Sequence, residues 1–347
     1  MPRRLKQYLF FCLFLPSIGW AELPVIKMIA TGGTIAMKVD PQTNAPVPAI
    51  TGEDLLSTVP EIRKLARVEV DNLFNIPSDH MTPDHWLVIH KAVQKAVDRK
   101  EVAGVIISHG TDTLEETAYF LDLTINSTKP IVLIGAQRNA SEKDFDGPRN
   151  LYNAVRVVAA PEAKGKGVMI VMNHQINAAR EATKSHTSDV ESFKSGDYGF
   201  LGRVNADRVL FYRQSLRRQH IRLRDQTLSK VNIISMYAGA DGSLVDAAVR
   251  AETKGIVIQA FGMGNVNPPV FDAIKKALRH NIPVVISTRV PHGDVAPIYG
   301  FEGGGKTLLD AGAIFAGDLS PQKSRILLML VLQAGVSPQG IQAYFDR

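Results

Sequence analysis

A hydroxyl and a carboxylate stand side by side at Thr111 and Asp112. The apolar, β-branched run 104–108 before them predicts a buried strand, and the run 114–121 predicts a helix with acidic residues in its first turn. Ligands of open α/β sheets bind where strands end and helices begin, and the free N–H groups of a helix start favour negative charge there. The two side chains are therefore predicted to face a ligand.

Thr34 follows a second predicted strand, 25–30, through a turn that contains Gly32 and Gly33. The glycines allow a tight turn and the close approach of a substrate. A threonine hydroxyl at the tip is a nucleophile only when something removes or shares its proton, and Lys184 is the candidate lysine for this task. Each feature also has a plainer interpretation. The turn would be an ordinary strand-ending turn capped by threonines, and Lys184 would be a solvated surface lysine.

Strand-like and helix-like segments alternate from residue 25 to about residue 210, which predicts a mostly parallel sheet covered on both faces. We assign this part to a larger N-terminal α/β domain, 22–206. The Arg- and Gln-rich stretch 207–230 has little periodicity and is interpreted as a linker, and alternation resumes in a smaller α/β domain, 231–347. The expected strands are 25–30, 67–70, 104–108, 130–135, 167–172, 231–237, 255–260 and 283–287, and the expected helices begin at residues 82, 114, 150, 269 and 320.

The first residues differ from the rest, because a basic start, an apolar run and small residues at the end predict a cleaved secretory signal, 1–21. This segment has three basic residues and no acidic one, so its removal lowers the formal net charge from +6 to +3. Cys12, the single cysteine, leaves with it, which excludes disulfides and cysteine chemistry from the mature chain. We expect a periplasmic protein without a membrane segment after cleavage; an uncleaved anchor is the alternative.

Several classes of function lack their usual motifs. The basic excess is small and not clustered with aromatic residues, so nucleic-acid binding is not indicated. The chain has no Gly-x-Ser-x-Gly, P-loop or His-Glu-x-x-His motif, and His80, His85 and His90 do not share a helical face. The segment that contains Gly262 and Gly264 lacks the third glycine of a dinucleotide-binding fingerprint. Neither a metal nor a nicotinamide cofactor is therefore expected.

The two threonine segments, 30–36 and 109–118, resemble the two signature motifs of the bacterial L-asparaginase/glutaminase-asparaginase family. The resemblance continues in order through 146–154, 180–184 and 319–323 and covers essentially all of the mature chain. With its export signal, the sequence is similar to the type II, periplasmic branch. The resemblance implies a flavodoxin-like larger sheet, a Rossmann-like smaller domain, and hydrolysis of L-asparagine to L-aspartate and ammonia without a metal or organic cofactor.

The resemblance also implies catalytic roles. Thr34 would be the nucleophile that attacks the amide carbon, and Thr111 would lie opposite it. Asp112 and Lys184 would tune the proton of Thr111. Backbone N–H groups near Thr111 and Ala136 would stabilise the developing oxyanion.

Substrate-binding residues follow from the same comparison of motifs. Ser78 would hold the α-carboxylate of the substrate, and Asp79 and Asp112 would bind its α-ammonium group. The resemblance further implies a homotetramer built from dimers, with sites shared between subunits. Asn265 and Glu302 are the residues expected to reach the partner's site from the smaller domain.

One departure from the family concerns the loop after the first motif. The family usually has a tyrosine there, hydrogen-bonded to the nucleophile, but residues 37–50 contain none. Ala45 stands at or near its place, and Tyr299, from a neighbouring subunit, is the candidate substitute. The region around Thr34 is therefore where this chain departs from the expected pattern.

Two alternatives to an L-asparaginase remain open. A glutaminase-asparaginase of broader amide specificity would use the same residues, and Asp79, shorter than Glu, could leave room for a longer substrate. A periplasmic amino-acid binding protein would also suit an exported pair of α/β domains. Its site would lie between the domains and would need no pair of hydroxyls.

Overall fold

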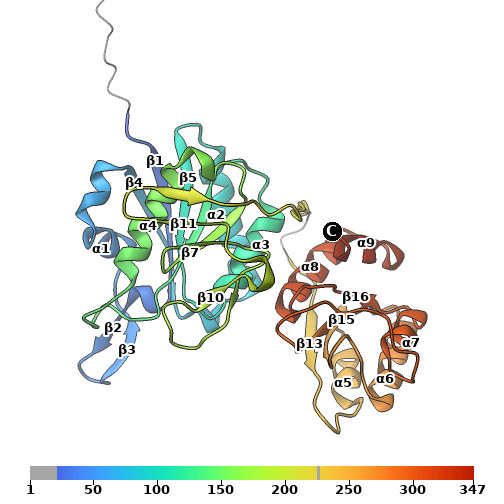
Figure 1. The fold of residues 1–347 in the computed structure, drawn as a ribbon. Helices are drawn as coiled ribbons and strands as arrows, with labels where there is room; N and C mark the ends of the chain where they lie inside the picture. The colour runs from blue at the N-terminus through green and yellow to red at the C-terminus, as the bar shows by residue number, and fades with distance from the viewer. Residues whose placement is uncertain (1–21, 225–226) are drawn as a thin grey trace, which may run out of the picture.

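Two sheets, one of eight strands and one of four, divide the protein into a larger N-terminal and a smaller C-terminal α/β domain (Figure 1). The computed structural model describes residues 22–224 and 227–347. The predicted signal, 1–21, and its Cys12 lie outside them. The predicted fold class, a mostly parallel larger sheet followed by a smaller α/β domain, is confirmed.

Five neighbouring strands of the larger sheet are parallel, and three more extend it with antiparallel pairing. Across the sheet the order is β12 (Val209–Phe211), β11 (Gly202–Val204), β8 (Gln175–Ala178), β7 (Val168–Met172), β6 (Ile131–Ile134), β5 (Val102–Ser108), β1 (Val25–Gly32) and β4 (Arg67–Ile76). Counted along the chain, the parallel strands follow the flavodoxin-like order 2-1-3-4-5. The order reverses between β1 and β5, which is where ligands of such sheets bind.

Helices cover both faces of the larger sheet. Alternate residues of β1 point to opposite layers, so that Ile29 joins the apolar cluster with α2 and α3, whereas Ile26 and Met28 join the cluster with α1 and α4. The helices are α1 (Gly52–Ser57), α2 (Pro83–Asp98), α3 (Leu114–Thr124) and α4 (Gly147–Ala159). The two layers bury β1 and β5 almost completely and fix the loops at their carboxyl ends.

The smaller domain contains a four-stranded parallel sheet in sequential order. Its strands are β13 (Val231–Ser235), β14 (Gly255–Ala260), β15 (Val284–Thr288) and β16 (Ile314–Phe315). Helices α5 and α6 pack together beside the sheet, and α8 packs on β13, β14 and β15. The helices are α5 (Ser243–Arg250), α6 (Pro268–Arg279), α7 (Gly305–Asp310), α8 (Pro321–Gln333) and α9 (Gln342–Phe345).

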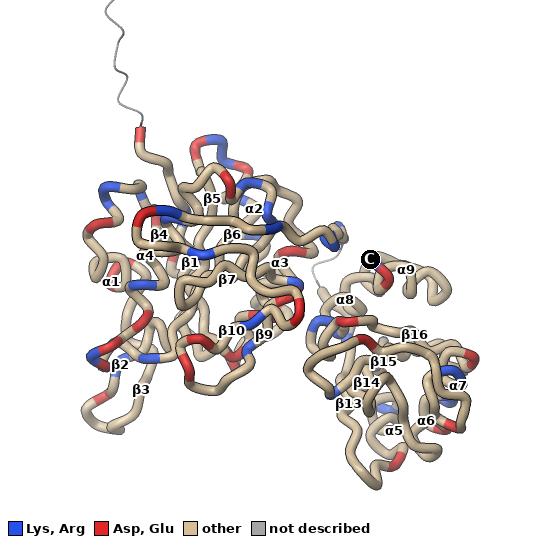
Figure 2. The backbone as a smooth tube through the Cα atoms, in the orientation of Figure 1, with Lys and Arg blue, Asp and Glu red and all other residues tan. Residues whose placement is uncertain are grey.

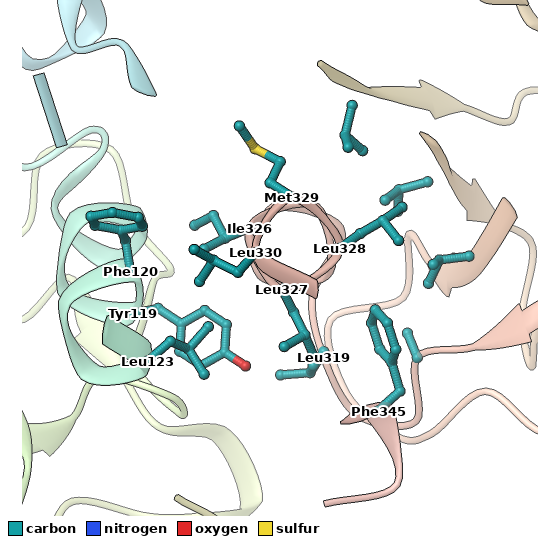
Figure 3. Packing of buried hydrophobic residues seen from close by; sticks show 14 of the residues in the cluster. Tyr119, Phe120, Leu123, Leu319, Ile326, Leu327, Leu328, Met329, Leu330 and Phe345 are labelled. Carbon is teal, nitrogen blue, oxygen red and sulfur yellow. The ribbon is translucent and has the colours of Figure 1, made fainter. Parts of the chain in front are cut away.

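Helix α8 joins the two domains because it packs on its own sheet and on α3 of the larger domain. Figure 3 looks along α8 and shows Tyr119 and Leu123 of α3 facing Ile326 and Leu327 of α8. The buried cluster is continuous across this contact. The space between α3 and α8 is therefore filled with apolar side chains.

Two small hairpins and several short 3-10 helices complete the described chain. The hairpins are β2 (Met37–Asp40) with β3 (Ala45–Pro48), and β9 (Thr183–Lys184) with β10 (Phe193–Lys194). The 3-10 helices are η1 (Thr34–Ala36), η2 (Pro60–Lys64), η3 (Ser78–His80), η4 (Pro161–Ala163), η5 (Gly196–Tyr198) and η6 (Pro338–Gly340).

Three differences from the sequence prediction concern the linker, the start of helix α4 and the loop after the first threonine motif. Residues Val209–Phe211, assigned to the linker, form the edge strand β12, which pairs with β11. This run is short but apolar, and its arginine-rich surroundings concealed it in the sequence. Helix α4 begins at Gly147 rather than residue 150, with Pro148 in its first turn. The loop after the first threonine motif is the hairpin β2–β3.

Charges of both signs alternate over both domains in Figure 2, which agrees with the small predicted excess of basic residues. Among residues 22–224 and 227–347, no helix has both the length and the apolar character needed to cross a membrane.

Candidate active site

The two predicted threonine turns meet at the point where the strand order reverses. The turn after β1 is anchored on both neighbouring strands, because Thr31 Oγ1 donates to Ser108 O at 2.9 Å and Gly33 N donates to Ile76 O at 2.9 Å. Gly33 itself lies against the backbone of Gly110. The segments that carry Thr34 and Thr111 are therefore in contact, as their places at the ends of β1 and β5 predict.

Lys184 reaches the second threonine turn directly. Its Nζ donates to Thr111 Oγ1 at 2.8 Å and to Asp112 Oδ1 at 2.6 Å. The lysine and Thr111 are largely buried, whereas Asp112 is exposed. The interpretation of Lys184 as a solvated surface lysine is therefore wrong. Lys184 lies next to Thr111, as expected.

Lys184 reaches the site because the chain reverses direction after the last parallel strand of the larger sheet. The chain turns back after β7 into the antiparallel strand β8 and then enters β9, which ends at Lys184 and pairs with β10. The backbone N–H of Lys184 donates to Glu115 Oε2 at 3.1 Å. Glu115 is buried in the first turn of α3 and was interpreted from the sequence only as a helix-start acid.

Ser78 lies beneath the second threonine turn. Its Oγ accepts from Asp112 N at 3.2 Å, and its carbonyl accepts from Thr113 Oγ1 at 2.7 Å. Ser78 is buried, whereas the side chain of Asp79 is 66% exposed, with its carboxylate 3.9 Å from His80 Nε2. The Ser78 hydroxyl therefore belongs to the cluster, and the Asp79 carboxylate faces solvent.

Ala136 follows β6 and is fully buried. The preceding Gly135 lies against the side chain of Thr111, since a Cβ on Gly135 would come 2.9 Å from Thr111 Cγ2. Asp146 holds this loop by accepting from the backbone N–H groups of Gln137 and Arg138, at 3.1 and 3.0 Å. The loop that carries Ala136 thus packs against the side chain of Thr111.

His109 is buried and holds a hydrogen-bond chain under Gly110. Because the Gly110 carbonyl can only accept, His109 Nδ1 donates to it, at 2.7 Å, and Nε2 accepts from Thr117 Oγ1 at 2.9 Å. Trp86 Nε1 in turn donates to Thr117 Oγ1 at 3.0 Å. Burial lowers the pKa of His109 from 6.5 to about 4, so the ring is neutral and structural at neutral pH.

The remaining predicted residues do not join this cluster within the described chain. Asn265 Oδ1 accepts from Gly305 N at 3.1 Å, and Glu302 is exposed in the loop before α7. Tyr299 is 44% exposed beside Phe301 in the same loop. Ala45 is exposed on β3, where it pairs with Asp40 at the far end of the hairpin, and no described residue hydrogen-bonds to the Thr34 hydroxyl.

In the described part of the chain, no group of three or more His, Cys, Asp or Glu residues is placed to hold a metal ion. The groups that the site brings together are a hydroxyl, an amine and a carboxylate.

The fold and this cluster define an α/β protein with a hydroxyl-centred site at the switch point of a flavodoxin-like sheet. Residues 25–217 match the family described as asparaginase, N-terminal, and residues 230–345 match the glutaminase/asparaginase C-terminal domain. The chain belongs to the asparaginase family and is an amidohydrolase, as the sequence predicted.

Individual proteins agree with this assignment. L-asparaginase 2 of Bacillus subtilis is 37% identical over 94% of this chain and 87% of its own length. A Haemophilus influenzae protein named "Probable L-asparaginase periplasmic" is 38% identical, over 94% of this chain and 93% of its own length. The crystal structure of a protein named "Probable Cytoplasmic L-asparaginase" from Campylobacter jejuni is similar with a TM-score of 0.87 and 38% identity, covering 93% of this chain and 99% of that one.

Proposed function

We propose that this protein hydrolyses L-asparagine to L-aspartate and ammonia, with Thr34 as the nucleophile. The observation that carries the proposal is the contact of Lys184 Nζ with Thr111 Oγ1 and Asp112 Oδ1, beside the turn that carries Thr34. Relatives named L-asparaginase over nearly the whole chain support the same substrate.

The proposed reaction has two steps. Thr34 Oγ attacks the side-chain amide carbon, its proton passes through Thr111 and Lys184 to the leaving nitrogen, and the C–N bond breaks to release ammonia. Water then attacks the ester carbon, a proton returns to Thr34 Oγ through the same groups, and aspartate leaves. Backbone N–H groups near Thr111 and Ala136 would stabilise the oxyanion in both steps, and their closeness is supported by the packing of Gly135 on Thr111.

The substrate's amino-acid end would bind beside the second turn. Asp112 is exposed next to Thr111, so its carboxylate is available to an α-ammonium group as well as to Lys184. The exposed Asp79 carboxylate would add to this charge, and the buried Ser78 hydroxyl would contact the α-carboxylate.

The assembly we propose is a homotetramer with sites shared between subunits. In their own chain, Asn265 and Glu302 form no described contact with the cluster, as expected of residues that serve a partner's site. The loop before α7 exposes Ile298, Tyr299 and Phe301, which is an apolar surface suited to contact with another subunit. From such a loop, Tyr299 could supply the hydroxyl that residues 37–50 lack.

The location we propose is the periplasm. The basic and apolar start of the chain supports export, and the Haemophilus influenzae relative is named periplasmic. The Campylobacter jejuni structure is named cytoplasmic, so family membership alone does not decide the location. Amino-terminal sequencing of the protein from the bacterial periplasmic fraction tests this, and a mature chain beginning near Glu22 is expected.

The test of the catalytic proposal is ammonia release from L-asparagine by the purified protein. Thr34→Ala and Thr111→Val are each expected to lower kcat by at least about 10³-fold, because each removes a hydroxyl that takes part in bond making or proton transfer. Undiminished activity in both variants would contradict the proposed roles.

The second candidate is a glutaminase-asparaginase, which the exposed Asp79 favours because its short side chain does not enclose the substrate end. Comparable kcat/KM values for L-glutamine and L-asparagine would establish it. A binding protein with its site between the domains is not favoured, since apolar side chains fill the contact between α3 and α8.

A further inference from the structure

Lys323 is an amine buried in the contact between the two domains. Its residue is 3% exposed, and its Nζ donates to the backbone carbonyls of Arg180 at 2.8 Å and Ala182 at 2.5 Å. The Tyr119 ring lies 5.9 Å from the Nζ. Burial lowers the pKa of Lys323 to about 8, because removing the charged amine from water is unfavourable. The sequence singled out 319–323 as a family motif but gave Lys323 no role.

The carbonyls that Lys323 holds belong to the segment that ends at Lys184. Lys323 comes from the first turn of α8, where Ser320 Oγ accepts from Lys323 N and caps the helix. The smaller domain therefore reaches across the α3–α8 contact and fixes the backbone two residues before Lys184.

Glu115 fixes the same segment from the opposite end. Its buried carboxylate accepts from Lys184 N at 3.1 Å. Glu115 lies in the first turn of α3, and this helix begins three residues after Thr111. The backbone of Lys184 is thus attached to the helix that directly follows its side-chain partners, Thr111 and Asp112.

A third contact, made by Arg180, holds the beginning of the same segment. Arg180 donates through both terminal nitrogens to Asp318, at 2.7 and 2.8 Å, and the arginine side chain is 4% exposed. Asp318 follows β16 of the smaller domain. Residues 180–184 are therefore held at their beginning, middle and end by groups from both domains.

We propose that Glu115 and Lys323 are positioning residues that hold Lys184 against Thr111 and Asp112. The inference rests on the proposed function, in which Lys184 moves a proton at Thr111. Lys184 Nζ has to keep two short hydrogen bonds at once, 2.8 Å to Thr111 and 2.6 Å to Asp112. A misplacement of about 1 Å in such an arrangement costs about 10²-fold in rate. The smaller domain thus contributes to proton transfer in its own chain.

The test is a double-mutant cycle with Lys184→Met, which removes the amine being positioned. Glu115→Ala and Lys323→Met are each expected to lower kcat for L-asparagine by about 10- to 100-fold and to change KM by less than about threefold. In the Lys184→Met background, neither is expected to lower kcat further. Glu115→Gln keeps an acceptor for Lys184 N and is expected to restore most of the rate.

Glu116→Gln is the matched control. Glu116 lies beside Glu115 on α3 and faces Arg325 of α8 at 4.0 Å, so it belongs to the same contact between helices. It makes no described contact with residues 180–184, and its substitution is expected to leave kcat unchanged. If Lys323→Met does not fold, as judged by thermal unfolding, the Glu115 variants carry the test.

The outcomes separate the two proposals. Equal losses of kcat in the wild-type and Lys184→Met backgrounds would mean that Glu115 and Lys323 act independently of the amine, which overturns the positioning role alone. Full activity of Lys184→Met would overturn the proton-transfer role of Lys184 and the positioning role with it. A loss of kcat in Glu116→Gln as large as in Glu115→Ala would also contradict the inference.

Discussion

The Cα of Gly110 occupies the space that a side chain on Gly33 would need, since a Cβ on Gly33 would lie 2.1 Å from that Cα. Gly33 also has a φ of +83°, a conformation that favours glycine. Gly110 in turn lies against Ser78, whose Cβ would be 2.7 Å from an added Cβ. The segments of Gly33 and Gly110 thus meet backbone to backbone, and the side chain of Ser78 packs on Gly110.

Gly33→Ala is expected to separate the two threonine turns. The methyl group would clash with the Gly110 backbone and strain its own φ, which should lower the free energy of unfolding by about 3 kcal/mol or more. It should also lower kcat for L-asparagine by at least about 10²-fold, because Thr34 and Thr111 move apart. Urea unfolding and ammonia release measure the two effects.

Gly312→Ala separates strain from clash. Gly312 has a similar φ of +97°, but an added Cβ would meet nothing within 4 Å. Its substitution should cost about 1 kcal/mol of stability and leave kcat unchanged. Similar effects of the two alanines on both measurements would contradict the argument from close packing.

Lys184→Arg tests whether Lys184 acts by more than its charge. Arginine keeps a cation near Asp112, but it cannot lose a proton near neutral pH and its planar end does not fit the place of an amine. A loss of kcat of about 10² to 10⁴-fold is expected, the usual range for general acid–base groups. Activity within about threefold of the wild type would mean that charge alone suffices.

The sequence predicted the elements that end at the site because their signals are local. The apolar runs that become β1 and β5 were interpreted correctly as strands, and the glycines and hydroxyls that follow them lie at the strand ends as expected. The family resemblance was also confirmed. The roles of the individual site residues remain predictions.

What the sequence could not supply was the pairing of distant segments. Lys184 was the candidate lysine, but its local sequence alone favoured a surface lysine, because its burial depends on the hairpin β9–β10 and on contacts from Glu115. Lys323 is one polar residue in an otherwise apolar helix, and its partners lie more than 140 positions away. Val209–Phe211 became a strand because β11 offered an edge. Each outcome depends on tertiary packing.

Acid should destabilise the protein in part through His109. Its pKa is about 4 in the folded protein and about 6.5 when unfolded, so only the unfolded chain takes up a proton between these values. The contribution is fully present above pH 6.5 and is lost as the pH falls towards 4. Between pH 7.5 and 5.0 this should cost about 2 kcal/mol, measured by urea unfolding.

His109→Gln is the comparison for this prediction, because glutamine does not titrate and can still reach Thr117. The variant should be less stable than the wild type at pH 7.5 but should lose about 2 kcal/mol less on going to pH 5.0. An equal loss in the two proteins would show that His109 does not contribute to acid sensitivity.

Arg180→Lys tests the ion pair between the domains. Although burial opposes ionisation, the hydrogen bonds and charge of Arg180 hold the pKa of Asp318 below its usual range. Lysine cannot reproduce the two parallel bonds, so the free energy of unfolding should fall by about 1 to 3 kcal/mol. Arg217 contacts the same carboxylate at 3.0 Å but is 39% exposed, so Arg217→Lys should cost less than about 1 kcal/mol. Equal losses would mean that burial does not set the strength of this contact.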